Sequence, residues 1–310
     1  MPLTLPQEAE LILNRLMDQQ AIDPATAPEP ISTGTINTVW HAGLTGGEPV
    51  VVRVGPPSDV VERGPSWMRS GALACEAIVL DRVRQDLDAL PVPVAAGFRE
   101  PERPWLVQRV VPGRSFAEVM PAMRPEERAG IWGELGECLR RLHRIEAPWF
   151  GTPDGYRVFP DWAEMVRSDA EGLLDDARRY GLDPAPFERL REMVERHAEL
   201  LREVKSPAIV HSDLGPRHVF VRRPSDGAWR ISGLIDWEYS RYVDPLSESI
   251  VVELLARPEG DADRVAFLDG YGLDERALAN PTLWRRQEIY RAVAEGWSLT
   301  DAARIADVRR

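Results

Sequence analysis

Two short stretches of the chain decide its fold. "AIVHSDLGPRHVFV" (208–221) and "WRISGLIDWEY" (229–239) each join an apolar, β-branched run to an aspartate. Such runs predict strands, with Asp213 and Asp236 beside them and 23 residues apart. An unpaired carboxylate next to a buried strand is costly. The pair therefore indicates either a divalent cation with a proton acceptor or, equally well from spacing alone, two structural aspartates in salt bridges.

The rest of the chain divides into a β-rich part followed by a helical part. The pattern predicts a helix over 7–20, a hairpin ending in the strand Val50–Val54, a helix over 67–84 and a strand over 104–111. From Glu118 onward helical periodicity dominates, interrupted by the two stretches above. We therefore predict an α+β protein with two lobes: a small β-rich N-terminal lobe (1–111) and a larger α-helical C-terminal lobe (112–310).

The composition is that of an ordinary globular protein. Of the 310 residues, 44% are hydrophobic and 28% charged, and the net charge of −12 disfavours binding to nucleic acid or to an anionic membrane. Cys75 and Cys138 are the two thiols, too few for a disulfide framework, and we expect both to be buried apolar side chains. No export signal is visible, which favours the cytoplasm. Monomer and dimer are equally compatible with the sequence.

Three motifs together carry a resemblance to a known family. These are "LGECLRRLHRI" (135–145), "VHSDLGPRHVFV" (210–221) and "GLIDWEYSRYVDP" (233–245). In this order they are similar to the aminoglycoside phosphotransferase family of kinase-like small-molecule kinases, and some features are shared with macrolide and hygromycin phosphotransferases. The resemblance implies a bilobal protein-kinase-like fold. It also implies transfer of the γ-phosphate of ATP or GTP to a hydroxyl group.

The resemblance also implies roles for residues of the C-terminal lobe. Asp213 corresponds to the catalytic base that orients the acceptor hydroxyl, and Asp236 to the ligand of Mg²⁺. His211 and Asp244 are expected to support the catalytic loop, Asp244 by binding its backbone amides. Glu248 is a weaker candidate for the same support.

The N-terminal lobe is expected to hold the nucleotide. The resemblance places Gly34, in "STGTINTVW", in the loop over the phosphates. It places Arg53 at the position of a phosphate-pairing lysine and Glu76 at that of its partner acid. Arg109 to Val111 resemble the hinge that binds a purine through main-chain atoms.

Two positions depart from the family pattern. His218 stands where the template has a metal-binding asparagine, so Mn²⁺ is possible beside Mg²⁺. Arg53 replaces a lysine, and the two side chains are not equivalent. These departures keep a catalytically weak nucleotide-binding pseudokinase as an alternative.

The acceptor is the least constrained part of the prediction. Acids within 161–199 and after Asp236 would line the acceptor cleft and suit a cationic antibiotic, an aminoglycoside or alternatively a macrolide; a solvated acidic helix face is the other reading. An aromatic cluster would support a sugar or form lobe core: Trp149, Phe150, Tyr156, Phe159 and Trp162. The prediction is an antibiotic-resistance kinase, with a kinase of choline, a sugar or an amino alcohol as the rival.

Overall fold

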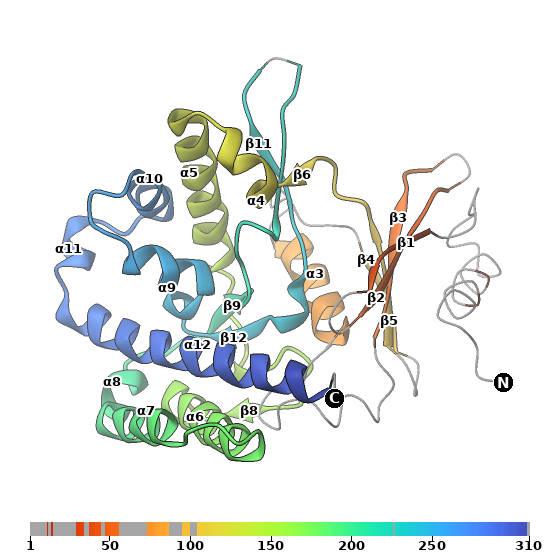
Figure 1. Ribbon diagram of the computed structural model, residues 1–310. Helices are drawn as coiled ribbons and strands as arrows, with labels where there is room; N and C mark the ends of the chain where they lie inside the picture. Colours follow the sequence, from red (N-terminus) through yellow and green to blue (C-terminus); the bar gives the residue numbers. More distant parts are fainter. Residues whose placement is uncertain are drawn as a thin grey trace.

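The fold is taken from a computed structural model of the chain. It describes residues 29–33, 37–44, 47–55, 73–86, 95–99, 104–225 and 227–308, together with Leu11 and Asn14. Strands gather at one end and helices at the other (Figure 1). The predicted helix over 7–20 lies outside the described residues except at Leu11 and Asn14, and so does the start of the helix predicted over 67–84.

A five-stranded antiparallel sheet forms the N-terminal part. Its order is β1-β2-β3-β5-β4. The strands are β1 (Glu29–Thr33), β2 (Thr38–Ala42), β3 (Val50–Val54), β4 (Ala95–Arg99) and β5 (Pro104–Arg109). The predicted hairpin is confirmed, because β2 and β3 pair from Thr38↔Val54 to Ala42↔Val50. Alternate β-branched and aromatic side chains fill a small core on one face, including Trp40, Val52 and Trp105.

Helix α3 (Leu73–Asp86) connects this sheet to the helical part. It contacts β4 and β5 on one side and the short helix η2 (Trp237–Tyr239) on the other. Val79, Leu80 and Val83 belong to the main core of the helical part. Because α3 is packed from both sides, its buried polar residue Glu76 is carried to the boundary between the two parts.

The chain passes from sheet to helices through residues 110–115. Here β6 (Arg114–Ser115) pairs with β10 (Val219–Arg222), a pairing that the sequence did not predict. Gly113 has φ +111°, and a Cβ atom there would lie 2.3 Å from the Val221 carbonyl oxygen. Glycine is therefore required at this close crossing, which pins the connector to the strand that follows the predicted catalytic loop.

The C-terminal part is mainly helical. Its helices are α4 (Phe116–Val119), η1 (Met120–Ala122), α5 (Pro125–Leu142), α6 (Trp162–Arg179), α7 (Ala185–Arg196), α8 (Ala198–Arg202), η2, η3 (Pro245–Ser247), α9 (Ser249–Ala256), α10 (Ala262–Tyr271), α11 (Glu275–Leu278) and α12 (Pro281–Val308). Helices α5 and α10 pack together in one core, and α6 and α7 pack against α12 in a second. The long helix α12 runs between α9 on one side and α6, α7 and α8 on the other (Figure 1).

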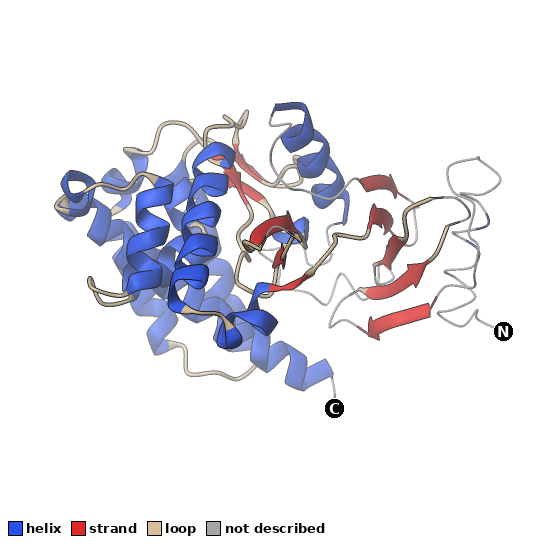
Figure 2. Cartoon of the chain, turned by 90° about the horizontal axis from the view of Figure 1, so that it is seen from above, coloured by secondary structure: helices blue, strands red, loops and turns tan. Residues whose placement is uncertain are grey.

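Short strands between the helices carry the two aspartates. They are β7 (Phe150–Gly151), β8 (Val158–Phe159), β9 (Ala208–Val210), β10, β11 (Arg230–Leu234) and β12 (Arg241–Val243). The two predicted strand stretches are confirmed, and β10 and β11 form an antiparallel hairpin. Asp213 lies in the loop from β9 to β10, and Asp236 is the second residue after the end of β11. Figure 2 shows the strands of the helical part facing the side on which the N-terminal sheet lies.

Cys75 and Cys138 are both free and buried, as predicted.

Among the described helices, none combines the length and the apolar character needed to cross a membrane.

Candidate active site

The loop at residues 211–218 is held in an unusual backbone conformation. Ser212 has φ +68° although it is not glycine, and Asp236, on the neighbouring segment, has φ +70°. Left-handed conformations of this kind persist where the surrounding contacts enforce them, and they concentrate at functional sites. The contacts around both residues therefore define a candidate site.

Glu248 binds the backbone of this loop. Its carboxylate accepts hydrogen bonds from the amides of His211 (2.8 Å) and Ser212 (3.1 Å), and from the amide of Ser249 (3.0 Å) at the start of α9. Glu248 is fully buried. Burial alone would raise the pKa of Glu248, but His143, with Nε2 3.8 Å from the carboxylate, His211 and the amide donors together lower it below the usual value.

The Asp244 carboxylate is bonded to partners other than the loop amides expected for it. Its carboxylate accepts from the amide of Leu246 (3.0 Å), from Arg286 Nη1 (2.9 Å) and from the hydroxyl of Tyr290 (2.5 Å). It thus joins η3 to α12. The amides assigned to Asp244 are bound by Glu248, because Glu248 begins the helix that faces the loop.

Replacing Glu248 by Ala is expected to lower the free energy of unfolding by about 3 kcal/mol, because one buried and two partly buried amides lose their acceptor. Urea titration measures the loss. Since the folded pKa of Glu248 is depressed, its stabilisation is complete above 4.5, the usual pKa, and is lost as the pH falls through the folded value. The control is Glu253→Ala on the same helix, whose half-exposed carboxylate contacts Arg257 and should change stability little. Equal losses in the two variants would contradict the assignment.

His211 links the loop to the segment that carries Asp236. Its Nε2 donates to the carbonyl of Ile235 (2.9 Å), the residue before Asp236. Its ring lies between those of Trp237 (4.7 Å between centroids) and His218 (5.8 Å). The ring is buried and does not line the cavity, so its contacts are with the two segments that carry the aspartates.

His218 stands between the two aspartates. Its Nδ1 lies 2.7 Å from the carbonyl oxygen of Asp213, which can only accept, so Nδ1 carries the proton. Nε2 then carries the lone pair and lies 3.4 Å from Asp236 Oδ2. Burial, and after it the nearby His211, lower the pKa of His218. A neutral ring with its lone pair toward a carboxylate fits a shared metal ion.

Arg217 joins Asp213 to His218. Its Nη2 donates to both carboxylate oxygens of Asp213 (2.8 and 2.9 Å), and its Nε donates to Nε2 of His218 (3.0 Å). The Asp213 carboxylate is partly exposed and faces the cleft. It is therefore accessible to a ligand while it is held in one orientation.

Arg53 gathers three carboxylates from two parts of the chain. Its Nη2 lies 2.6 Å from Asp236 Oδ1 and 2.9 Å from Glu238 Oε2, and its Nη1 donates to Glu76. Gln108 donates to Glu76 (2.5 Å). Burial alone would lower the pKa of Arg53, but the three carboxylates raise it above the usual value. The predicted ion pair of Arg53 with Glu76 is thus present, and Arg53 also pairs with Asp236 and Glu238.

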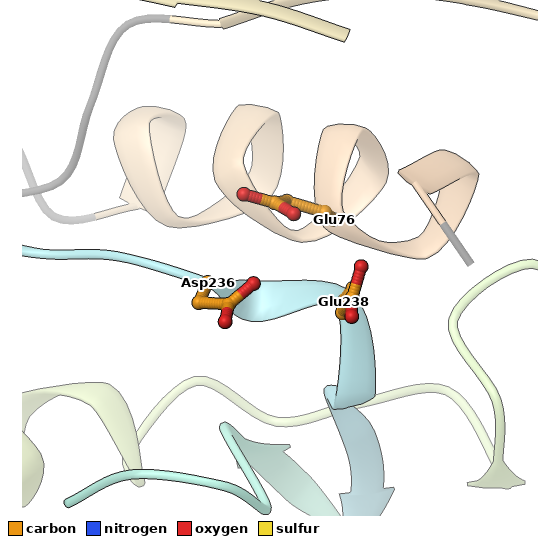
Figure 3. Close-up of side chains that lie close together, drawn as sticks. All are labelled: Glu76, Asp236 and Glu238. Atoms are coloured by element: carbon orange, nitrogen blue, oxygen red, sulfur yellow. The ribbon is translucent and has the colours of Figure 1, made fainter. Parts of the chain in front are cut away.

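The three carboxylates carry more negative charge than Arg53 balances. One oxygen each of Glu76, Asp236 and Glu238 lies within 4.8 Å of the others. Figure 3 shows the three side chains on either side of the boundary between α3 and the η2 segment. Burial raises the pKa of Glu238 to about 7, and Asp236 and Glu76 contribute to the rise. Oxygen donors with excess charge are the set that Mg²⁺ prefers. The residues therefore fit a divalent cation, with His218 beside them.

A cavity of about 1130 Å³ opens over these residues. Both parts of the chain line it, and it includes Arg53, Asp213, His218 and Asp236. Of the remaining predicted residues, Arg109 and Val111 line it at the connector, and Gly34 lies outside the described residues. The cavity is larger than a typical single-ligand pocket, which suits two ligands.

Three residues at the site were not predicted from the sequence. Glu238 stood in the "DWE" motif, Arg217 stood between Asp213 and His218, and Asn37, which donates to Glu238, lies on the loop before β2. Of the three, only Glu238 could have been suspected from the sequence, because it lies two residues after Asp236. The other two contacts depend on how separate segments meet.

A comparison with known protein families identifies the family of the chain. The model of the phosphotransferase enzyme family matches residues 28–283. The chain belongs to this family. Membership confirms the expected enzyme class and, with the resemblance drawn from the three motifs, accounts for the order of strands and helices over most of the chain.

Solved structures show the same fold at low sequence identity. Aminoglycoside phosphotransferase APH(2'')-Ib, with ADP bound, is 16% identical, with a TM-score of 0.61 over 92% of this chain and 95% of that one. Macrolide 2'-phosphotransferase type I is 17% identical, with a TM-score of 0.57 over 96% and 91%. Macrolide 2'-phosphotransferase MphH from Brachybacterium faecium is 20% identical, with a TM-score of 0.55 over 95% and 97%. No curated protein matches the sequence. The predicted kinase-like α+β fold is confirmed.

Proposed function

We propose that this phosphotransferase moves the γ-phosphate of ATP or GTP to a hydroxyl group of a small molecule. The observation that carries the proposal is the meeting of Asp213, His218 and the Arg53 cluster at one cavity lined by both parts of the chain. Positioning and charge neutralisation are the main tasks of a phosphoryl-transfer enzyme. Asp213 can position the acceptor, and Arg53 and the acids around it can neutralise charge.

Asp213 is proposed to accept the proton of the acceptor hydroxyl. The hydroxyl oxygen bonds to the γ-phosphorus while the bond from that phosphorus to the β–γ bridging oxygen breaks. The proton goes to the Asp213 carboxylate and then to water, and the products are a phosphate ester and a nucleoside diphosphate. Arg217 supports this role, because its two hydrogen bonds hold the carboxylate in one orientation.

Asp236, Glu238 and His218 are proposed to hold a divalent cation, Mg²⁺ or Mn²⁺. The bound ion would supply charge neutralisation at the nucleotide phosphates. Burial alone would raise the pKa of Asp236, but the Arg53 guanidinium lowers it below its usual range, so its carboxylate is ionised near neutral pH. Arg53, held by Glu76, is placed to pair with phosphate oxygens beside the ion.

The nucleotide base is proposed to lie between the sheet and the β10–β11 hairpin. The cavity there has apolar walls formed by Ile31, Val39, Val51, Val111, Phe220 and Ile235. Flat apolar walls suit the faces of a purine. Val110 donates its amide to Pro49 (3.0 Å), so Arg109 and Val111 supply the main-chain groups next to the base. ADP bound to APH(2'')-Ib supports a nucleotide donor in this fold.

Nucleotide binding and acceptor turnover test the proposal together. Mg²⁺ with ATP or GTP should raise the melting temperature, by mass action on the folded state. A coupled assay over antibiotics, choline, sugars and amino alcohols should then detect diphosphate release, and mass spectrometry should find one added phosphate. Absence of nucleotide binding would contradict the proposal and favour a pseudokinase.

Replacing His218 by Asn is expected to preserve activity and to lower the Mg²⁺ concentration for half-maximal rate. Asn offers a carbonyl oxygen where His218 presents Nε2 to Asp236, and Mg²⁺ prefers oxygen. Metal titrations of the phosphorylation rate with Mg²⁺ and with Mn²⁺ measure the shift. The same metal dependence in both proteins would mean that His218 only supports the loop.

A further inference from the structure

The acceptor side of the cavity carries a continuous set of apolar side chains among its polar ones. We call "acceptor wall" the side chains that line it on the helical part: Val166 of α6, Tyr239 of η2, Val252 of α9, and Val293, Ala294 and Trp297 of α12. Tyr239 and Trp297 meet edge to face at 5.7 Å. Aromatic and branched surfaces of this kind bind ligands by removing apolar area from water.

The carboxylates beside the acceptor wall are all engaged by arginines. Asp169 is bonded by Arg157 (3.1 Å) and Arg241 (2.7 Å), and Asp301 by Arg304 (2.5 Å). Asp213 is held by Arg217, as described above. Among the cavity-lining residues that the structure describes, these are the acids on this side, so the surface offers no unpaired carboxylate to a cation.

The acidic stretches of the sequence therefore do not form a cationic subsite. Of the acids within 161–199, Asp169 alone lines the cavity, and of those within 232–275 only Asp236 and Glu238 do so, at the proposed metal position. A polyamino sugar would lose hydration at several ammonium groups without gaining free carboxylates, which is unfavourable. Arg241 and Arg304 are equally engaged, so an anionic acceptor gains little.

We propose that the acceptor is a bulky, mainly apolar alcohol with at most one amino group, whose apolar face packs on Tyr239 and Trp297. This inference rests on the proposed function, because it takes Asp213 as the group that receives the hydroxyl. It replaces the cationic acceptor that the acidic stretches of the sequence suggested.

Calorimetry of acceptor binding, with and without Mg²⁺ and a non-hydrolysable ATP analogue, tests the inference. The probes are a macrocyclic lactone carrying one tertiary amine and a polyamino sugar carrying four or more amines. The lactone should bind at least tenfold more tightly. Trp297→Ala should weaken its binding roughly tenfold, about 1.4 kcal/mol, because the main aromatic contact is lost. Trp297→Phe should recover part of it.

The matched control is Leu299→Ala on the same helix, since Leu299 is 54% exposed and does not line the cavity. It should leave lactone binding unchanged. Equal or tighter binding of the polyamino sugar, or unchanged lactone binding in Trp297→Ala, would overturn the inference and leave the kinase proposal standing. Failure of the nucleotide analogue to bind would overturn the kinase proposal, and the titrations without nucleotide would still decide the acceptor class.

Discussion

Replacement of Asp236 by Asn is expected to lower kcat/KM for phosphoryl transfer by about 10²- to 10³-fold, the size of loss seen when one preorganised electrostatic contact at a reacting group is removed. Asn keeps the size of the side chain and tolerates the left-handed backbone at φ +70°. It removes the ionised oxygens that face Arg53 and His218. The proposed cation would therefore be held too weakly to neutralise the phosphates.

Steady-state rates over a range of Mg²⁺ concentrations measure this effect. The variant should fold, because it relieves the excess negative charge shared with Glu76 and Glu238, and its melting temperature checks that point. Glu199→Gln is the control for removal of one carboxylate, since its side chain is 91% exposed on α8, and its activity should be unchanged. Retention of most activity in Asp236→Asn would rule out a metal role for Asp236.

Replacement of Asp213 by Asn is expected to reduce kcat by about 10²- to 10⁴-fold, the usual contribution of a general base. The amide has the same shape but cannot accept the acceptor proton. The KM for nucleotide should change little, because the nucleotide is proposed to lie on the other side of His218. Single-turnover assays separate the chemical step from product release.

Arg217→Gln is the matched variant for Asp213→Asn. It breaks the same ion pair, in which Arg217 contacts both oxygens of Asp213, but leaves the carboxylate in place. If Asp213 acts as the base, Arg217→Gln should lose far less activity than Asp213→Asn. Equal losses would show that the ion pair, not the proton acceptor, is what the reaction needs.

Local patterns predicted most of the fold. β-Branched runs predicted the hairpin ending at Val50–Val54 and the strands on either side of Asp213 and Asp236, because strand side chains repeat with a period that is visible in sequence. The family resemblance supplied the bilobal arrangement. The β6 pairing was missed, since a two-residue strand is formed by its partner β10 rather than by its own pattern.

The candidate site was predicted less completely than the fold. Asp213, Asp236, Arg53 and Glu76 were recognised from motifs and meet at one cavity or one ion-pair cluster. Asp244 was expected to bind the loop amides, which Glu248 binds instead. Both acids occur close together in the chain, and the orientation of α9 selects one of them.

The sequence by itself determined the family, the order of elements and the two central aspartates, because these depend on short-range spacing and hydrophobic period. Only the tertiary structure decided how charges are paired. The arginines that neutralise Asp169 lie 12 and 72 positions away from it in the chain, and Arg53 reaches Asp236 across 183 positions. A count of charged residues does not show which of them form ion pairs. For this reason the acids within 161–199 and after Asp236 suggested a cationic acceptor, whereas the paired acids and the acceptor wall of the cavity favour an apolar one.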